Sequence, residues 1–336
     1  MIYYLVTRKG DHTYRNNFIL DDARLAGRFR VLTYDEAFGQ QNWQGGAVIF
    51  SDVDRLASGE VLQATVLYRR LKRARGPIRL LNHPTRTCRR YAVLRRLHDA
   101  GINRHNVFRL DEGRGGWRYP VFLRSDLQHE GAYTPLLHDD AALDAEIWRL
   151  TSLGLLPQDL LIVEFCDTAD RDGIYRKATA YVVGDRLFQR YLFFGDHWEV
   201  KQPRSGTVAE KRSERAMLDE EGAYNGGDHY LPVLREVVDR TGFEFGRIDF
   251  DFKDGRPEIW EINSNPDPAV MLFANAGERA ARIAPRGWQQ LREALAALDS
   301  DAAHNVRVEI EPPPSTAIWY DWFKEEVRQR TGKPTG

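Results

Sequence analysis

The chain has 336 residues, of which 42% are hydrophobic, and a formal net charge of −1. This length allows two or three compact units with real cores, and the near-zero charge gives no overall field that would recruit nucleic acid or an anionic membrane as a partner. No apolar run approaches the roughly 20 residues that cross a bilayer, and Cys88 and Cys166 have no metal-type spacing, so we expect a cytoplasmic protein.

The first 83 residues alternate strand-like and helix-like segments. A helix capped within Ser51–Asp54 is predicted to run to about Arg75. Short apolar strands are predicted at Met1–Thr7, Phe29–Thr33, Ala47–Ser51 and Ile78–Leu81. This alternation predicts an N-terminal α/β domain over residues 1–83 with a mostly parallel sheet. No Gly-x-Gly-x-x-Gly follows the first strand, which argues against a dinucleotide site.

Residues 84–125 are expected to link this domain to the central core. A helix is predicted over Thr87–Ala100, and Arg89 and Arg90 lie in its first turn, where cations are unfavourable unless an anion compensates. A strand follows at Tyr119–Arg124 and ends in a cation. The arginine fork is suited to phosphate, although a surface arginine at a strand end is the simpler alternative.

Residues 126–201 are expected to form a small α+β subdomain. A helix is predicted over Asp140–Leu153, and three strands are expected to form one antiparallel sheet: Leu160–Cys166, Ile174–Val183 and Arg186–Phe194. The last two meet at a two-residue turn, Gly184-Asp185.

Polar side chains on these strands are candidate ligands. Glu164 is predicted near a strand end, and a buried glutamate requires a cation or polar ligand close by. The chain has eight lysines, and lysine is rare in strands, so Lys177 and Lys201 are informative. Lysines that protect a sheet edge are the alternative explanation.

Residues 202–298 are expected to form a C-terminal, β-rich core. Helices are predicted over Val208–Glu220, Leu231–Thr241 and Arg279–Leu298. Residues 299–336 are expected to form an extension that packs on the body. Its aromatic helix, Trp319–Arg328, could also contact a second subunit, so a homodimer is one option and the oligomeric state stays open.

The stretch Gly246–Pro266, GRIDFDFKDGRPEIWEINSNP, predicts two strands around a turn at Asp254-Gly255. Because side chains alternate faces along a strand, one face is expected to be apolar and the other polar. The apolar face is expected to hold Ile248, Phe250, Phe252, Trp260 and Ile262, and the polar face Arg247, Asp249, Asp251, Glu261 and Asn263. Converging oxygen ligands are what Mg²⁺ requires. We therefore predict a metal site, with a solvated outer face as the alternative.

This metal site requires a particular hairpin register. Asp249 and Glu261 share a face only if the residue numbers of paired positions sum to an even value. A two-residue loop would pair Lys253 with Arg256, which gives an odd sum. We therefore expect either a three-residue loop or a β-bulge.

The pair of motifs Arg247-x-Asp249 and Glu261-x-Asn263 resembles the metal-binding end of the ATP-grasp superfamily, whose members include D-alanine–D-alanine ligase, glutathione synthetase and the ribosomal-protein glutamate ligases. The resemblance covers roughly residues 82–275. It implies an α/β protein with the ATP-grasp fold: an N-terminal α/β domain, a small α+β lid over residues 126–201, and a β-rich C-terminal core, with ATP between the last two.

The resemblance also implies roles for the polar face of the hairpin. Asp249, Glu261 and Asn263 would hold the metal, two Mg²⁺ ions or Mn²⁺ in their place. Asp251 shares their face and could replace Asp249 as a ligand. Arg247 would act catalytically, by stabilising the transferred phosphoryl group or the tetrahedral intermediate.

Other residues would bind the nucleotide by the same resemblance. Arg124 takes the position where the family usually has a lysine that contacts the phosphates, and Lys177 and Lys201 would cover the triphosphate. Glu164 and Phe165 would form the hinge whose backbone meets the adenine edge.

The implied function is that of an ADP-forming, carbon–nitrogen bond-forming ligase. It would activate a small-molecule or peptide carboxylate as an acylphosphate and join it to an amine or similar nucleophile. Two alternatives stay open: an ATP-grasp kinase that phosphorylates a small molecule, and a nucleotide-binding homologue without catalysis, which the arginine at position 124 favours.

Overall fold

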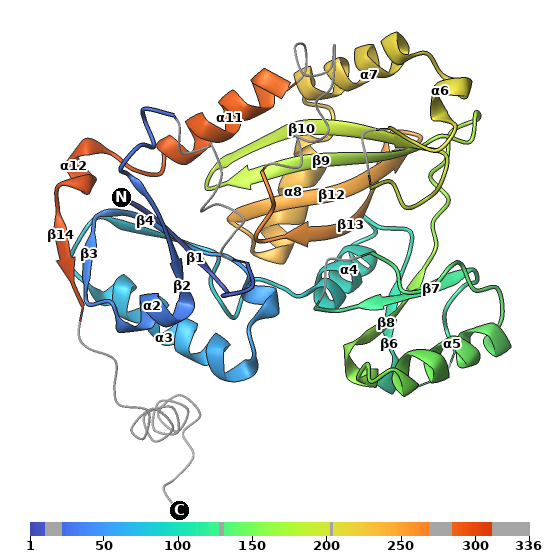
Figure 1. The fold of residues 1–336 in the computed structure, drawn as a ribbon, viewed down its shortest axis with the longest axis horizontal. Helices are drawn as coiled ribbons and strands as arrows, with labels where there is room; N and C mark the ends of the chain where they lie inside the picture. Colours follow the sequence, from blue (N-terminus) through green and yellow to red (C-terminus); the bar gives the residue numbers. More distant parts are fainter. Residues whose placement is uncertain (11–21, 114, 128–130, 202–203, 269–283, 311–336) are drawn as a thin grey trace, which may run out of the picture.

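A computed structural model gives the fold of this chain (Figure 1). It describes residues 1–10, 22–113, 115–127, 131–201, 204–268 and 284–310. The helix expected at Trp319–Arg328 lies outside the described residues.

The N-terminal domain is built on a parallel four-stranded sheet, as predicted. Its strands are β1 (Ile2–Val6), β2 (Phe29–Thr33), β4 (Gly46–Phe50) and β5 (Ile78–Leu81), in the order β2-β1-β4-β5. Helices α2 (Tyr34–Gly39) and α3 (Ser58–Arg73) cover one face (Figure 1). The two central strands, β1 and β4, are apolar and buried along their whole length because both of their faces are covered.

The start of α3 differs from the prediction. Residues Ser51–Asp54 do not cap it, because Val53–Arg55 forms a separate 3-10 turn and α3 begins at Ser58. Its first turn is capped by Glu60, whose carboxylate accepts from the backbone N–H of Ala57 at 2.8 Å.

A three-stranded antiparallel sheet follows, in the order β6-β8-β7. Its strands are β6 (Val107–Arg109), β7 (Val121–Ser125) and β8 (Leu160–Glu164). Helix α5 (Asp140–Ser152) packs on one face through Leu143 and Leu150, and α4 (Arg90–Asp99) packs on the other through Leu94. This unit occupies the lower right of Figure 1.

The largest sheet has the order β11-β10-β9-β12-β13. Its strands are β9 (Tyr175–Val183), β10 (Arg186–Gly195), β11 (Arg204–Ser205), β12 (Phe245–Lys253) and β13 (Arg256–Asn263). One expectation was therefore wrong: β8 does not join β9 and β10 in one sheet, and the expected lid of residues 126–201 is divided between two sheets. β9 instead pairs along β12, from Phe245 to Phe250.

Helices cover both faces of this large sheet. Helices α7 (Glu214–Gly226) and α8 (Leu231–Thr241) pack on one face, and α11 (Ala284–Ala296) packs with the N-terminal sheet on the other (Figure 1). A short helix, α6 (Val208–Lys211), precedes α7, so the helix predicted at Val208–Glu220 is broken into two. In the described part of the chain, no helix is both long and apolar enough to span a membrane.

The first part of the C-terminal extension packs on the N-terminal domain. After α12 (Asp301–His304), strand β14 (Arg307–Glu309) pairs antiparallel with β3 (Asn42–Gln44). Residues Arg307–Glu309 thereby extend the N-terminal domain by a two-stranded sheet.

Candidate active site

The β12–β13 hairpin places Asp249 directly opposite Glu261. The strands pair from Lys253 and Arg256 across a two-residue turn, and the register shifts between Asp249 and Phe250. The predicted requirement for a longer loop or a bulge is therefore met by a bulge. The two carboxylates lie side by side on one face of the sheet.

Trp260 is the residue that this bulge displaces. Pairing with β12 passes from Glu261 to Ile259, which leaves Trp260 without a direct cross-strand partner. Its ring stacks on His105, with centroids 4.3 Å apart and an interplanar angle of 19°, and it lines a pocket. The expectation that Trp260 lies on the apolar face was wrong, because a bulge breaks the alternation of side chains.

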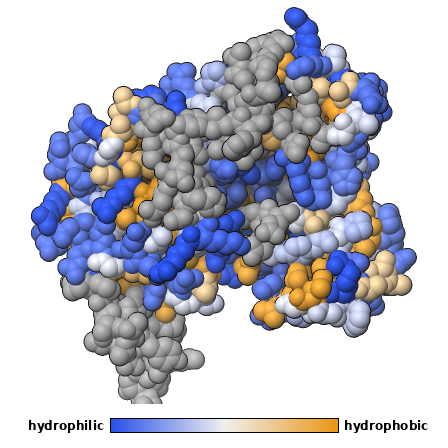
Figure 2. All heavy atoms as spheres, in the orientation of Figure 1, coloured by the Kyte–Doolittle hydropathy of each residue, from blue (hydrophilic) through white to orange (hydrophobic). Residues whose placement is uncertain are grey.

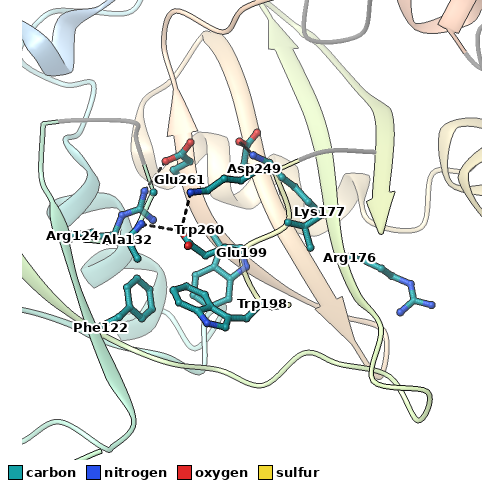
Figure 3. Close-up of a pocket in the computed structure, with 13 residues that line it drawn as sticks. Phe122, Arg124, Ala132, Arg176, Lys177, Trp198, Glu199, Asp249, Trp260 and Glu261 are labelled. Atoms are coloured by element: carbon teal, nitrogen blue, oxygen red, sulfur yellow. Dashed lines mark hydrogen bonds and ion pairs between the residues drawn. The ribbon is translucent and has the colours of Figure 1, made fainter. Parts of the chain in front are cut away.

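This pocket, of about 200 Å³, opens between the three-stranded and five-stranded sheets (Figure 3). Five residues predicted for the site line it: Arg124, Lys177, Lys201, Asp249 and Glu261. Aromatic rings that were not predicted for the site also line it: Phe122, Trp198 and Trp260. Figure 2 shows that hydrophilic side chains cover much of the described surface on the same side of the molecule.

Asp249 is 2% exposed and is held by two cations. Arg247 donates to both of its oxygens, with Nε–Oδ1 at 2.5 Å and Nη2–Oδ2 at 2.8 Å, and Lys177 Nζ lies 2.9 Å from Oδ2. Burial opposes the charge of Arg247, but the neighbouring Asp249 and two tyrosines outweigh it and raise the pKa of Arg247. Arg247 therefore stays charged in the buried site.

Glu261 is held by two arginines from different elements. Arg90 Nη2 lies 2.7 Å and Arg124 Nη2 2.9 Å from the same oxygen, Oε2. Burial, followed by the charge of Arg90, lowers the pKa of Arg124 to about 10, so it is cationic at neutral pH. Arg90 is the first residue of α4, and Glu261 is the anion that compensates its unfavourable position.

Asn263 and Arg247 lie next to this carboxylate pair but do not line the pocket. They are direct cross-strand partners, 8% and 6% exposed. The Oδ1 atom of Asn263 accepts from the backbone N–H of Asn265 at 2.9 Å. The amide is thereby oriented by the turn that follows β13.

Asp251 lies apart from the pocket, which favours Asp249 as the ligand candidate. A loop covers Asp251: the hydroxyl of Thr168 donates to Oδ2, as does the backbone N–H of Arg176 at 3.3 Å. Burial raises the pKa of Asp251 to about 7. This carboxyl is therefore a buried structural group.

Glu164 also lies outside the pocket, at the end of β8. Arg118 Nη2 lies 2.7 Å from Oε2, and the backbone N–H groups of Arg118 and Asn106 also donate to the carboxylate. Burial favours the neutral form, but these donors outweigh it and lower the pKa of Glu164. Arg118 is thus the cation that the sequence analysis required close to a buried Glu164. Phe165 packs near the pocket, with its ring centroid 6.0 Å from that of Trp198.

The remaining cations have different positions. Lys201 lies at the pocket edge, 62% exposed, with Nζ 3.7 Å from Glu199. Glu199 itself accepts from the backbone N–H of Ala132 at 2.9 Å. Arg176 points away from Asp249 in Figure 3 and pairs with Glu220. Lys177 and Arg176 thus lie on opposite faces of β9, as their adjacent positions require.

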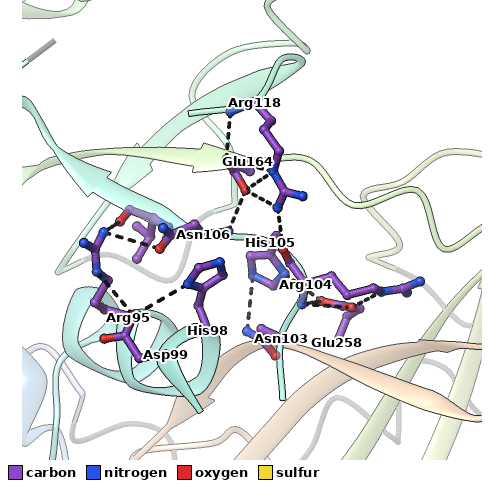
Figure 4. A network of polar contacts seen from close by, with 11 residues as sticks. Arg95, His98, Asp99, Asn103, Arg104, His105, Asn106, Arg118, Glu164 and Glu258 are labelled. Atoms are coloured by element: carbon purple, nitrogen blue, oxygen red, sulfur yellow. Dashed lines mark hydrogen bonds and ion pairs between the residues drawn. The ribbon is translucent and has the colours of Figure 1, made fainter. Parts of the chain in front are cut away.

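Behind the aromatic wall lies a buried polar network (Figure 4). His105 and Glu258 are both fully buried, with Nδ1–Oε2 at 2.9 Å, and Glu258 also accepts from the side chain and backbone of Arg104. Burial favours neutral Glu258, but His105 and Arg104 outweigh it and lower the pKa of Glu258. The side-chain amide of Asn103 donates to the backbone oxygen of Ile259 and accepts from its backbone N–H, each at 2.9 Å. This network fixes the strand segment that carries Trp260.

The oxygen ligands of the site fit Mg²⁺ in kind, since they are two carboxylates and an amide on adjacent strands. Among the residues that the structure describes, no three His, Cys, Asp or Glu side chains form a metal cluster. Cations already neutralise both carboxylates: Arg90, Arg124, Lys177 and Arg247. A divalent ion must displace them, and phosphate oxygens are suitable new partners. The site therefore fits a metal that arrives together with a polyphosphate.

Comparison with known proteins gives a structural likeness. No family model matches the sequence, and no curated protein matches it. One similar structure is a D-alanine–D-alanine ligase from Bacillus anthracis complexed with ATP, which is 10% identical, with a TM-score of 0.51 over 88% of this chain and 97% of that chain. Another is the D-alanine–D-alanine ligase from Coxiella burnetii, which is 9% identical, with a TM-score of 0.50 over 99% of each chain.

Proposed function

We propose, from the ATP-grasp fold that this chain has, that it is an ATP-dependent ligase. In this proposal it activates a carboxylate as an acylphosphate and joins it to an amine or similar nucleophile. The nucleotide lies in the pocket between β7 and the β9–β12–β13 part of the large sheet. Small-molecule or peptide carboxylates and amines are the substrate class.

The observation that carries this proposal is the convergence of four cations on two neighbouring carboxylates, of which Arg124 and Lys177 line the pocket together with both carboxylates. Arg90 and Arg124 approach from the side of the three-stranded sheet, and Lys177 and Arg247 from the large sheet. A triphosphate carries several negative charges that need such donors. A partly buried site also strengthens each contact relative to water.

The residues have distinct tasks in the proposed reaction. A substrate carboxylate oxygen attacks the γ-phosphorus, the bond to the β-phosphate oxygen breaks, and ADP leaves. Lys177 and Arg124 hold the phosphates in line, and Arg247 stabilises negative charge that develops during transfer. The amine then attacks the acyl carbon, phosphate leaves and the amine loses a proton.

The proposed metal ligands are Asp249, Glu261 and Asn263. Bound Mg²⁺ would neutralise negative charge on the phosphates during transfer. The aromatic side chains of Phe122, Trp198 and Trp260 offer flat apolar surfaces on which a nucleobase can stack. Lys201, at the exposed edge, is suited to covering the phosphates after binding.

Hydroxylamine trapping tests this proposal. The full chain would be incubated with ATP, Mg²⁺, hydroxylamine and a panel of amino acids and dipeptides, with ADP and hydroxamate measured together. A ligase gives equal amounts of ADP and hydroxamate with at least one carboxylate. ADP without hydroxamate would instead identify a small-molecule kinase and refute the ligase.

A second candidate is a nucleotide-binding protein without catalysis. The double pairing of Glu261 with Arg90 and Arg124 favours it, because two guanidinium groups compete with any metal for that carboxylate. In this case the chain binds ATP, and no carboxylate in the panel stimulates ADP release above that of a Lys177→Met control.

A further inference from the structure

A second cavity lies at the carboxyl ends of the parallel strands of the N-terminal sheet. It has a volume of about 380 Å³, within the range of small-molecule sites. Arg8 and Lys9 follow β1, Asp35 follows β2, Arg55 follows β4, and Leu127, from the segment after β7, closes one side. Its walls therefore come from two different parts of the fold.

The order of the strands makes this position significant. The chain runs from β1 outward to β2 on one side, then returns to β4 on the other side of β1. The connection that leaves β1 and the connection that leaves β4 therefore run in opposite directions, toward β2 and toward β5. This leaves a crevice between the carboxyl ends of β1 and β4. Open parallel sheets bind ligands in such crevices, where the strand order reverses.

The cavity carries positive charge that its own carboxylates leave uncompensated. Arg8 pairs with Asp35 at 2.7 Å, and Glu60 is engaged with the backbone at the start of α3. Lys9 has no ion-pair partner among the described residues. Arg55 lies 3.5 Å from Asp52, and its buried Nε has no hydrogen-bond partner there. A ligand with a negative group would give Lys9 a partner and would add to the contact that Arg55 has with Asp52.

The loop that carries Lys9 is held in place. The backbone N–H and the hydroxyl of Thr7 donate to Asp52 Oδ2, at 3.2 and 2.9 Å. Asp52 has φ 52°, a left-handed conformation that is costly without glycine. A Cβ at Gly10 would collide with the same carboxylate, so only glycine fits there. A strained, tightly fixed loop at a strand end is typical of a ligand site.

Two chains of contacts join this cavity to the nucleotide pocket. Arg89 donates to the backbone oxygen of Leu56 at 2.9 Å, and the next residue, Arg90, holds Glu261. Asn265, just after β13, donates to Asp52 at 3.1 Å. These contacts connect the walls of the second cavity to Glu261 and to the end of the hairpin.

We propose that the second cavity binds an anionic group, a carboxylate or a phosphate, of the substrate that reacts in the nucleotide pocket. This inference rests on the proposed function and narrows its substrates to molecules with a negative group besides the reacting one. Lys9 and Arg55 provide the charge, and the fixed loop provides the position.

Calorimetric titration of three probes tests this site. Inorganic phosphate, succinate and uncharged succinamide would be titrated into the full chain saturated with Mg²⁺ and the non-hydrolysable analogue AMP-PNP, so that the cations of the nucleotide pocket are occupied. We expect one of the two anions to bind, which identifies the group, and succinamide not to bind. Lys9→Glu should weaken that binding at least tenfold, and Lys72→Glu, an equal charge change on the same domain, less than twofold.

The proposal is overturned if neither anion binds, or if Lys9→Glu and Lys72→Glu behave alike. Titration of AMP-PNP into the unmodified chain distinguishes failure of this proposal from failure of the proposed function. If the analogue itself does not bind, the nucleotide site is refuted. The same probes titrated into the nucleotide-free chain and its Lys9→Glu variant then decide the anion site alone.

Discussion

Asp249 and Glu261 are direct cross-strand neighbours because Trp260 bulges out of β13. Without that bulge, the two-residue turn would place the carboxylates on opposite faces of the sheet. One displaced residue thus creates both the acidic pair and an aromatic wall of the pocket.

Glu261→Gln should destabilise the fold by about 3 kcal/mol, because it leaves Arg90 and Arg124 buried, adjacent and without their shared anion. Urea denaturation measures the loss. Glu146→Gln, which breaks an exposed pair with Arg149, is the control and should cost less than about 1 kcal/mol. Equal losses in the two variants would show that Glu261 does not neutralise the arginines.

Lys177→Met should weaken nucleotide binding about tenfold and leave the fold intact. Asp249 keeps its two-point contact with Arg247, so no carboxylate loses its last cation. Calorimetric titration with AMP-PNP and Mg²⁺ measures the affinity, with the surface variant Lys72→Met as the control. Unchanged affinity in Lys177→Met would exclude this lysine from the phosphate site.

His105 should act as a positioning residue for Trp260. His105→Ala removes the ring under the indole and should weaken nucleotide binding several-fold, while His105→Phe keeps a flat ring there and should restore much of the affinity. The near-ultraviolet circular dichroism of the tryptophans should change in the alanine variant. If the phenylalanine variant bound the nucleotide as weakly as the alanine variant, the effect would instead be due to the lost contact with Glu258.

Asp251 should make stability depend on pH. Burial raises the pKa of Asp251 from 3.8 to about 7, so between these values the folded state holds a proton that the unfolded state has released. Stability from this group is therefore complete below about pH 4 and falls as the pH rises through 7. Asp251→Asn removes this loss. As the pH rises from 4 to 8, the free energy of unfolding of the variant should therefore increase by on the order of 2–4 kcal/mol relative to that of the unmodified chain.

Urea denaturation at several pH values measures this difference. The exposed Asp239→Asn variant is the control and should follow the unmodified chain. A constant difference between Asp251→Asn and the unmodified chain across the range would contradict the raised pKa of Asp251.

The sequence predicted the fold where the signals are local. Periodicity and turn residues located the four parallel strands, α5, α8 and the β9–β10 hairpin closely, and the ATP-grasp motifs predicted the overall fold. Strand partners depend on distant segments, and the prediction failed there: nothing within Leu160–Glu164 shows that it pairs with β6 and β7 rather than β9.

Part of the site was predictable, because that part also depends on local patterns in the sequence. Alternation along the hairpin gave its polar face, and the register argument required a bulge or a longer loop without locating the bulge at Trp260. The arginines at the start of α4 violated the helix-dipole preference, which was the available signal for Arg90. The packing of Trp198 against Phe122 depends on segments distant in the chain, and no local pattern reports it.

The proposed ligase activity depends first on the binding of a magnesium nucleotide in the pocket that contains Asp249 and Glu261. The direct measurement is a calorimetric titration of the full chain with AMP-PNP, with and without Mg²⁺, alongside the double variant Lys177→Met/Arg124→Met. We expect one binding site per chain, with an affinity that Mg²⁺ strengthens and that the double variant loses. No binding by the unmodified chain, or equal binding by the double variant, would contradict it.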